Sequence, residues 1–342
     1  MMASGESVTP LLKEYGAITR DALQRFLPQQ EPRKFLYEPI ADYPMRGGKM
    51  MRPSLCIATT KAFGGSIDDA INAAVSIELM HNALLIHDDI EDGSDERRGE
   101  PTLHKKHGLP LALNVGDALV LLSVRPLIEY TNILGPLCGK QVFEELDRMG
   151  IESAEGQAME LGWRQYNQCN LVDQDYLLMI LKKTCWLATI YPMRMGVLIA
   201  TRGAHDLNRY IRFGFFLGAA FQIQDDILNL YADDNYGKEL NGDLWEGKRT
   251  LMIIRLHGLA TKSEKARLQL ILSVGREARD PADVDWLRDR IAHYKCIEYA
   301  QRIAHGLAGA AQHEADRLFS HLPPSRDKDF ILGLSKWVFE RN

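Results

Sequence analysis

Three aspartates lie close together near the end of one apolar stretch of the chain. Asp88 and Asp92 are four residues apart, so on a helix they share one face, and Asp89 flanks them. Because carboxylates this close repel one another, the cluster needs a cation nearby, unless it only marks a solvated helix end. A calcium-binding EF-hand loop is excluded, because Ile90 and Gly99 would stand where that loop requires ligands.

A second acidic cluster repeats this arrangement later in the chain. Asp225 and Asp226 follow another apolar run, and Asn229 stands one turn further on. Both clusters are rich in oxygen ligands, which suit a hard cation such as Mg²⁺. In proteins Mg²⁺ keeps several waters and usually bridges a few carboxylates to substrate phosphates. We therefore expect a magnesium site and, with it, a phosphorylated ligand.

Positive charge gathers near both clusters in the sequence. A glycine pair precedes Lys49 and Arg52, although this segment could also be a plain polar turn between helices. His81 lies about two helical turns before Asp88, where a buried core histidine is the alternative. The other cations near the clusters are Arg97, Arg98, Lys183, Lys238 and Lys248. Together they supply the charge that binding and departure of a diphosphate would require.

Helical spacing dominates the elements that must carry these residues. Apolar residues recur every three or four positions in segment after segment, and strand patterns are nearly absent. The expected helices span residues 9–27, 51–62, 67–92, 110–134, 139–161, 172–201, 205–231, 249–259, 262–279 and 283–320. No flexible linker divides the chain. The sequence therefore predicts one all-α domain over 1–342, a single large helical bundle, with a loose N-terminal tail over 1–8.

The composition is that of an ordinary globular protein. The 342 residues include 41 Lys and Arg against 46 Asp and Glu, a formal charge of −5, and 46% are hydrophobic. This balance lacks the basic stripe of a duplex-binding protein, so no nucleic-acid partner is expected. A helical-repeat scaffold is not expected either, because the chain has no repeat period.

Five cysteines are scattered along the chain without a paired motif, namely Cys56, Cys138, Cys169, Cys185 and Cys296. This pattern argues against a disulfide framework and against a zinc–thiolate site. The N-terminus lacks the charge and apolar pattern of a secretory signal, and no apolar run reaches the ~18 residues that cross a bilayer. We expect a protein of the reducing cytoplasm without a transmembrane segment.

Seven short motifs together resemble the trans-isoprenyl (polyprenyl) diphosphate synthase family, most of all its geranylgeranyl members. They are GGK..RP at 47–53, HN..LIHDDIED at 81–92, RRG at 97–99, GQ at 156–157, KT at 183–184, FQ..DD at 221–226 and GDLWEGKRT at 242–250. The resemblance spans nearly the whole chain. It implies an isoprenoid synthase fold around a central apolar cavity, a homodimer, and three Mg²⁺ per site. It also implies isopentenyl diphosphate and an allylic prenyl diphosphate as substrates.

The resemblance assigns roles to individual residues. It implies that Asp88 and Asp92, assisted by Asp89, bind Mg²⁺ on one side of the allylic diphosphate, and Asp225 on the other. The residues implied to hold isopentenyl diphosphate are Lys49, Arg52, His81 and Arg98. Those implied to neutralise the leaving diphosphate are Arg97, Lys183, Lys238 and Lys248. Those implied to contact it or the allylic cation are Thr184 and Gln222. Asn229 replaces the third aspartate of many members, and Met50 and Met51 replace a more basic stretch.

The implied reaction runs by ionisation, condensation and elimination. Mg²⁺ and the cationic side chains stabilise the departing diphosphate, the isopentenyl double bond attacks the allylic cation, and a proton is then lost. An apolar cavity keeps water away from the cation. Within the same superfamily, a class I terpene cyclase would share the helices and one acidic cluster but would not need a second diphosphate site. A non-catalytic subunit of a partner synthase is another alternative.

The residues before the first acidic cluster are expected to set the product length. In the family, bulky residues four and five positions before the first aspartate stop the growing chain. Those positions hold Leu84 and Ala83, and the small Ala83 is expected to leave room for a C20 product, geranylgeranyl diphosphate. Met80 and Ile77, about 12 and 16 Å from Asp88 along the helix axis, could form the floor. A farnesyl (C15) or longer (C25+) diphosphate synthase is the alternative.

Overall fold

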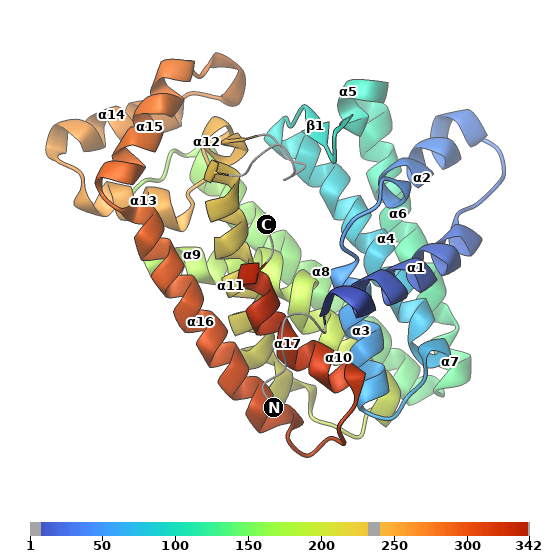
Figure 1. Ribbon diagram of the computed structural model, residues 1–342. Coiled ribbons are helices and arrows are strands. Elements are labelled where there is room, and N and C mark those ends of the chain that lie inside the picture. Colours follow the sequence, from blue (N-terminus) through green and yellow to red (C-terminus); the bar gives the residue numbers. More distant parts are fainter. Residues whose placement is uncertain (1–7, 232–239, 341–342) are drawn as a thin grey trace.

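Helices form nearly all of the structure, a computed structural model that describes residues 8–231 and 240–340 (Figure 1). The α-helices are α1 (Val8–Phe26), α2 (Glu38–Met45), α3 (Met51–Ala62), α4 (Ile67–Asp92), α5 (Leu103–His107), α6 (Leu109–Ile128), α7 (Tyr130–Ile133), α8 (Pro136–Gln165), α9 (Asp173–Ile180), α10 (Tyr191–Thr201), α11 (Ile211–Tyr231), α12 (Gly242–Glu246), α13 (Leu251–Leu259), α14 (Lys262–Ser273), α15 (Pro281–His293), α16 (Cys296–Phe319) and α17 (Arg326–Glu340). Segments of other pitch are the π-helical η2 (Arg33–Tyr37) and η3 (Leu181–Ile190) and the 3₁₀-helical η4 (Leu207–Tyr210) and η5 (Arg276–Ala278). β1 (Glu96–Arg97) and β2 (Glu100–Pro101) pair as a small antiparallel hairpin. The all-α prediction is confirmed.

The helix that carries the first acidic cluster has clear start and stop signals. α4 begins after Ser66, whose hydroxyl accepts the Asp69 amide while the Asp69 carboxylate accepts the Ser66 amide. It ends at Gly93, whose φ of +65° suits a residue without a side chain. The predicted bounds 51–62 and 67–92 coincide with α3 and α4. Asp88 and Asp92 therefore lie in the last two turns of α4.

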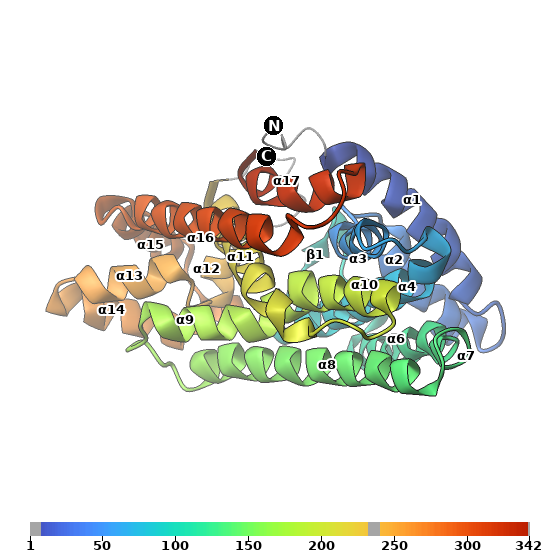
Figure 2. The same cartoon turned by 90° about the horizontal axis from the view of Figure 1, so that it is seen from below.

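α3, α4, α8, η3 and α11 border a common central space. α4 packs on α3 and α6, whereas α8 packs on η3 and α10, and α11 packs on η3 and α16. Seen from below, α8 runs along one edge of the molecule, and α17 and α1 lie at the opposite edge (Figure 2). Apolar side chains of these helices fill the core between the layers. This packing holds the five elements around the central space.

Several element boundaries differ from the predicted ones. α2, α5, α12 and α17 are absent from the predicted helices, and α15 and α16 are two helices where one was expected over 283–320. The break lies at Lys295, which has a left-handed φ of +52°. α2 is short and contains Pro39 and Pro44, which the sequence pattern marks as helix-breaking. α1 already includes Val8, which is buried and was expected in the loose tail.

α6 and α7 together, Leu109–Ile133, are long and apolar enough to cross a membrane by length and composition alone. The prediction of no transmembrane segment rested on the lack of an uninterrupted apolar run, whereas this segment passes on its mean hydropathy although Asn114 and Asp117 interrupt the run. One side of α6 packs on α4 and places Val115 and Leu119 in the core. The other side exposes Leu113 and Leu121. Because α6 is partly buried in the protein, it gives weak support for a membrane span.

Candidate active site

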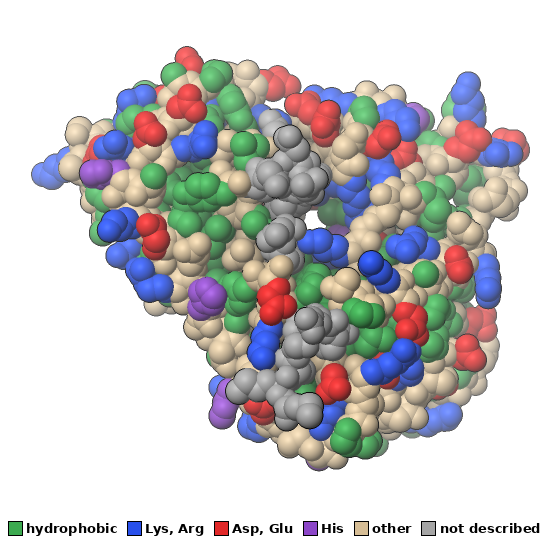
Figure 3. All heavy atoms as spheres, viewed as in Figure 1, with side chains coloured by type: hydrophobic (Ala, Val, Ile, Leu, Met, Phe, Trp, Pro, Cys, Tyr) green, Lys and Arg blue, Asp and Glu red, His purple; other side chains and the backbone are tan. Residues whose placement is uncertain are grey.

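A cavity of about 960 Å³ lies between α3, α4, α8, η3 and α11. Its lining combines many charged side chains with apolar ones, including Leu84, Leu187 and Phe221. Figure 3 shows a hollow on this face of the molecule, with Lys and Arg side chains gathered beside it. A partly apolar cavity of this size with converging polar groups is typical of a substrate site.

The two acidic helix ends lie on this cavity. Asp88 of α4 and Asp225 of α11 both line it. Lys248, which follows α12, connects the two sides. Its Nζ lies 2.9 Å from an Asp92 oxygen and 3.5 Å from an Asp243 oxygen. The structure thus brings together the two clusters that the sequence separates by more than a hundred residues.

Asp88 is surrounded by cationic and polar groups. The Lys183 Nζ donates to its Oδ1 at 3.1 Å, and the Gln157 Nε2 donates to the same oxygen at 3.3 Å. Burial alone would raise the pKa of Asp88, but Lys183, Lys248 and Arg97 outweigh burial and hold that pKa far below its usual range. Asp88 is therefore ionised at neutral pH, as a metal-binding carboxylate must be.

Asp89 points away from the cavity into a buried network. Its carboxylate is 1% exposed and accepts the Tyr43 hydroxyl at 2.6 Å and the Arg97 Nε at 3.0 Å. Arg97, predicted to neutralise a leaving diphosphate, lines the cavity while bonded to Asp89. Asp89 therefore positions Arg97 and the end of α4 in this structure.

Asp92 is also held by cations. It forms ion pairs with Arg164 of α8 and with Lys248, and it is not among the residues that line the cavity. Burial raises its pKa, but Lys248, Lys183 and Arg164 reverse that effect and lower it. Asp92 is thus ionised one turn from Asp88, close enough to share a bound cation after a change of side-chain conformation.

A chain of hydrogen bonds connects η3 to α11. The Thr184 hydroxyl donates to Gln222 Oε1 at 3.0 Å, and the Gln222 Nε2 donates to Asp226 at 2.7 Å. The Tyr176 hydroxyl donates to the other Asp226 oxygen at 2.7 Å. Burial and the nearby Asp243 raise the pKa of Asp226 to about 8. Asp226 therefore anchors its neighbours, while Asp225 lies on the cavity wall.

Asn229 lines the cavity and fixes the start of α12. Its Oδ1 accepts the Asp243 amide at 3.0 Å, and its carbonyl accepts the Asn241 amide at 2.8 Å. α12 and the residues directly after it carry Asp243 and Lys248 to the cavity. Lys238, the remaining predicted cation, lies outside the described residues.

A cationic pocket occupies another part of the cavity wall. It contains the four residues predicted to hold isopentenyl diphosphate, namely Lys49, Arg52, His81 and Arg98. Arg52 Nε and His81 Nδ1 are buried and make no hydrogen bond to any residue that the structure describes. Buried polar groups of this kind normally have a partner, so they point to a ligand in the cavity. An anion fits best, because Lys49, Arg52 and Arg98 outnumber the buried carboxylate beside them, Glu78.

The pKa values in this pocket follow from burial among like charges. Burial and the nearby Arg52 and Arg98 lower the pKa of His81 well below its usual value, so His81 is neutral at pH 7. Burial lowers the pKa of Arg52 to about 10, although buried Glu78 opposes this effect. Arg52 therefore remains charged, and the pocket keeps a net positive character.

Trp337 of α17 adds an aromatic wall beside this pocket. The Lys49 ammonium lies 5.7 Å from the centroid of its ring, within the range of a cation–π contact. Trp337 lines the cavity, but no sequence pattern singled it out, because α17 was not predicted.

The residues expected to set product length do not all reach the cavity. Leu84 lines it, together with His81 and Asp88 on the same face of α4. Ala83 is fully buried in the contact between α4 and α6, and Met80 lies in the core beside the cavity. Five residues on a helix correspond to a rotation of about 140°, which directs Ala83 away from the face of Asp88.

One face of α8 provides functional contacts that the sequence analysis missed. Gln157 contacts Asp88, and Glu160 pairs with Lys183. The spacing of three residues from Gln157 to Glu160, and four more to Arg164, is helical, so these side chains share one face. That spacing, starting from the GQ motif, could have identified both Glu160 and Arg164.

The acidic side chains fit a hard cation that shares oxygens with a substrate. Within residues 8–231 and 240–340, no three Asp, Glu, His or Cys side chains converge closely enough to hold a metal ion by themselves. Mg²⁺ is commonly bound by one or two carboxylates together with water and substrate phosphates. Ionised Asp88 on one wall and Asp225 on another, facing one cavity, match that type of site.

Comparison with known proteins gives a consistent assignment. Residues 33–291 match the polyprenyl synthetase family. A geranylgeranyl diphosphate synthase of Sulfolobus acidocaldarius is 33% identical over 286 residues, which cover 83% of this chain and 84% of that protein. A geranylfarnesyl diphosphate synthase of Natronomonas pharaonis is 29% identical over 364 residues, covering 100% of both chains.

A solved structure has the same fold. It is a geranylgeranyl pyrophosphate synthase from Corynebacterium glutamicum in complex with isoprenyl diphosphate and magnesium, with a TM-score of 0.85 and 22% identity. The superposition covers 97% of this chain and 99% of that one, which confirms the isoprenoid synthase fold. By its family match and its similarity to these relatives, the chain belongs to the polyprenyl synthetase family and is a trans-prenyltransferase that synthesises a prenyl diphosphate.

Proposed function

We propose that the enzyme condenses isopentenyl diphosphate with allylic diphosphates and releases mainly geranylgeranyl diphosphate. The observation that carries this proposal is the single cavity bordered by both acidic helix ends, a cationic pocket and apolar side chains. The cationic pocket supplies a second diphosphate site, which a terpene cyclase would not need. The C20 product is supported by the similarity to geranylgeranyl synthases, with farnesyl and C25 or longer products as the alternatives.

Each group of residues has a distinct task in this reaction. Lys49, Arg52, His81 and Arg98 hold the diphosphate of isopentenyl diphosphate through cationic and N–H donors. Asp88, Asp92 and Asp225 would hold Mg²⁺, three ions per site, which supplies electrostatic stabilisation of the leaving diphosphate when bound.

The remaining residues orient the allylic substrate and exclude water. Lys183 and Lys248 place positive charge where the diphosphate leaves. Thr184 and Gln222, which are hydrogen-bonded to each other, turn their polar side-chain groups towards the site where the diphosphate leaves. Apolar side chains such as Leu84 and Leu187 surround the growing hydrocarbon and keep water from the allylic cation.

The test uses the purified protein alone with isopentenyl diphosphate and dimethylallyl, geranyl or farnesyl diphosphate. With Mg²⁺ we expect geranylgeranyl diphosphate as the main product by chromatography, and no product after chelation with EDTA. Asp88→Asn should lower kcat by about 10² or more, because transition-state charge stabilisation is lost. Asp285→Asn, an exposed aspartate on α15, is the control and should leave kcat unchanged.

Each negative outcome has a defined meaning. Absence of any elongated product from the protein alone would falsify the proposal and favour a non-catalytic subunit. A farnesyl product, or one of C25 or longer, would contradict only the C20 assignment.

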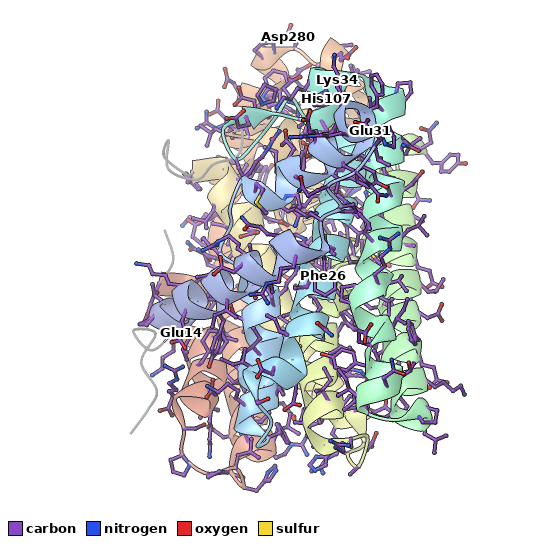
Figure 4. All side chains as sticks on the ribbon, turned by 90° about the vertical axis from the view of Figure 1, so that its right-hand side faces the viewer. Glu14, Phe26, Glu31, Lys34, His107 and Asp280 are labelled. Carbon is purple, nitrogen blue, oxygen red and sulfur yellow. The ribbon has the colours of Figure 1, made fainter. Side chains whose placement is uncertain are left out.

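We also propose that the enzyme is a homodimer formed through the outer side of α6 and the start of α8. Four apolar side chains on that side of α6 are exposed, namely Leu109, Leu113, Leu121 and Ile128, and Leu137 of α8 continues the surface. Figure 4 shows α6 and α8 standing side by side at the right of the molecule. Several exposed apolar side chains on one flank of a protein are typical of an interface between subunits.

We place the enzyme in the cytoplasm as a further part of the proposal. Its five cysteines are free and buried, as expected for thiols in a reducing compartment. Fractionation of the native cells, followed by detection of the protein, tests this location.

A further inference from the structure

α8 forms a wall of the cavity with mostly small side chains. The α8 residues that line the cavity are Gly150, Ser153, Ala154, Gln157, Ala158, Glu160 and Leu161, and of these Glu160 is paired with Lys183. Their spacing of three and four residues places them on one broad face of the helix. Gln157 marks the diphosphate end of this wall, because it donates a hydrogen bond to Asp88. Gly150 lies seven residues earlier, about 10 Å along the helix axis from Gln157.

Gly150 leaves open space where a side chain would stand. A Cβ built on Gly150 meets no atom within 4 Å. A Cβ on Gly156, by contrast, would lie only 2.7 Å from the Cα of Lys183. Gly156 is therefore required for the close approach of α8 and η3, whereas no close approach explains the glycine at position 150.

From this geometry we propose that Gly150 is a length-determining residue, at which the missing side chain leaves room for the last isoprene unit of the product. The inference rests on the proposed function and goes beyond it, because it names the wall that limits the hydrocarbon. The tail extends from the diphosphate end at Gln157 along the small side chains of α8, with Leu84 of α4 and Leu187 of η3 also on the cavity wall.

Ala83, the position suggested by the family resemblance, is poorly placed for this task. It is fully buried in one apolar cluster with Ala112, Val115 and Leu119 of α6. A larger side chain there would overpack the contact between α4 and α6 before it could block the cavity. A larger side chain at Gly150 meets open space instead.

The test compares Gly150→Leu with Gly162→Leu in the full-length enzyme. Gly162 is a matched control, because it lies on the same helix, a Cβ there also meets no atom within 4 Å, and it does not line the cavity. Leucine favours a helix more than glycine, so neither change should weaken α8. Each variant receives isopentenyl and dimethylallyl diphosphates with Mg²⁺, and the products are separated by chain length.

We expect Gly150→Leu to raise the ratio of farnesyl to geranylgeranyl product at least about tenfold, because a filled site cannot accept the same tail. Gly162→Leu should give the wild-type ratio. Gly150→Ala should give an intermediate ratio, and it carries the test if Gly150→Leu does not fold.

Two results overturn the inference while leaving the proposed function intact. One is an unchanged product length in a folded Gly150→Leu variant, and the other is an equal shift in Gly162→Leu. If the wild-type enzyme makes no prenyl diphosphate at all, the proposed function fails, and this inference fails with it.

Discussion

At the scale of single residues, the site is organised as pairs of opposite charge. Asp88 is paired with Lys183, Asp89 with Arg97, and Asp92 with Arg164 and Lys248. An unpaired buried carboxylate would be costly, and the cationic partners lower the pKa values of Asp88 and Asp92, whereas burial still raises the pKa of Asp89 despite Arg97. In the proposed reaction, a bound metal–diphosphate complex would have to compete with these internal cations for the carboxylates. The lysines can then turn towards the diphosphate oxygens as the aspartates turn towards the metal.

The contact between Trp337 and Lys49 gives a prediction at this scale. Trp337→Ala should raise the KM for isopentenyl diphosphate about 2–10-fold, since a cation–π contact contributes ~0.5–1 kcal/mol and more when desolvated. The KM for the allylic substrate and kcat should change little. Trp286→Ala is the control, because Arg267 lies 4.6 Å from that ring outside the cavity. Steady-state kinetics with each substrate varied in turn measures the effect, and an equal rise in both KM values would contradict it.

The sequence allowed individual site residues to be predicted where they belong to recognisable motifs, but not where they stand outside them. Asp88, Asp225 and Arg52 could be selected from spacing and charge, and they do line one cavity. Tyr43 and Trp337 could not be selected, because aromatic residues are usually core residues and only tertiary contact reveals their partners. Whether a side chain such as that of Ala83 faces the cavity depends on which side of the helix it occupies in the folded protein. The matching position in the family's motif does not by itself give that orientation.

At the scale of elements, periodicity located helices better than it located their ends. α3 and α4 were predicted to the residue, since α4 has a capping box and a terminal glycine. The predicted helix 172–201 is α9, η3 and α10, and its π-helical middle was not foreseen. A π-helical segment widens the turn without changing the apolar pattern, and such segments often occur at functional sites. Here it carries Lys183 and Thr184 into the cavity.

The close approach of α8 to η3 gives a prediction at the element scale. Gly156→Ala should lower the free energy of unfolding by about 1–3 kcal/mol, because its Cβ would overlap the main chain of Lys183. Turnover should fall as well, since η3 would shift together with Lys183. Gly162→Ala, with open space at its Cβ, is the control and should not lower stability. Thermal denaturation and kcat measure both effects. Wild-type stability in Gly156→Ala would show that the two helices separate without cost.

At the scale of the whole molecule, one chain leaves its cavity wall incomplete. Ala154 and Ala158 of α8 line the cavity and are also exposed to solvent. The exposed apolar side of α6 belongs to the same flank of the molecule (Figure 4). A second copy bound there would cover both surfaces at once. Dimer formation would then exclude water from the hydrocarbon as well as bury the leucines of α6.

Leu121 tests this view, because it is 72% exposed near the middle of the apolar side of α6. In a dimer, Leu121→Glu would place a charge in a desolvated contact, so we expect the dimer dissociation constant to rise at least about tenfold. Leu270→Glu is the control, since Leu270 is 68% exposed on α14, away from that surface, and the dimer should persist. Sedimentation velocity over a range of concentrations distinguishes the species. A wild-type enzyme that is monomeric at assay concentration, or a Leu121→Glu variant that dimerises as tightly as the wild type, would place the interface elsewhere. Loss of turnover in parallel with dissociation would further indicate that the second copy closes the cavity.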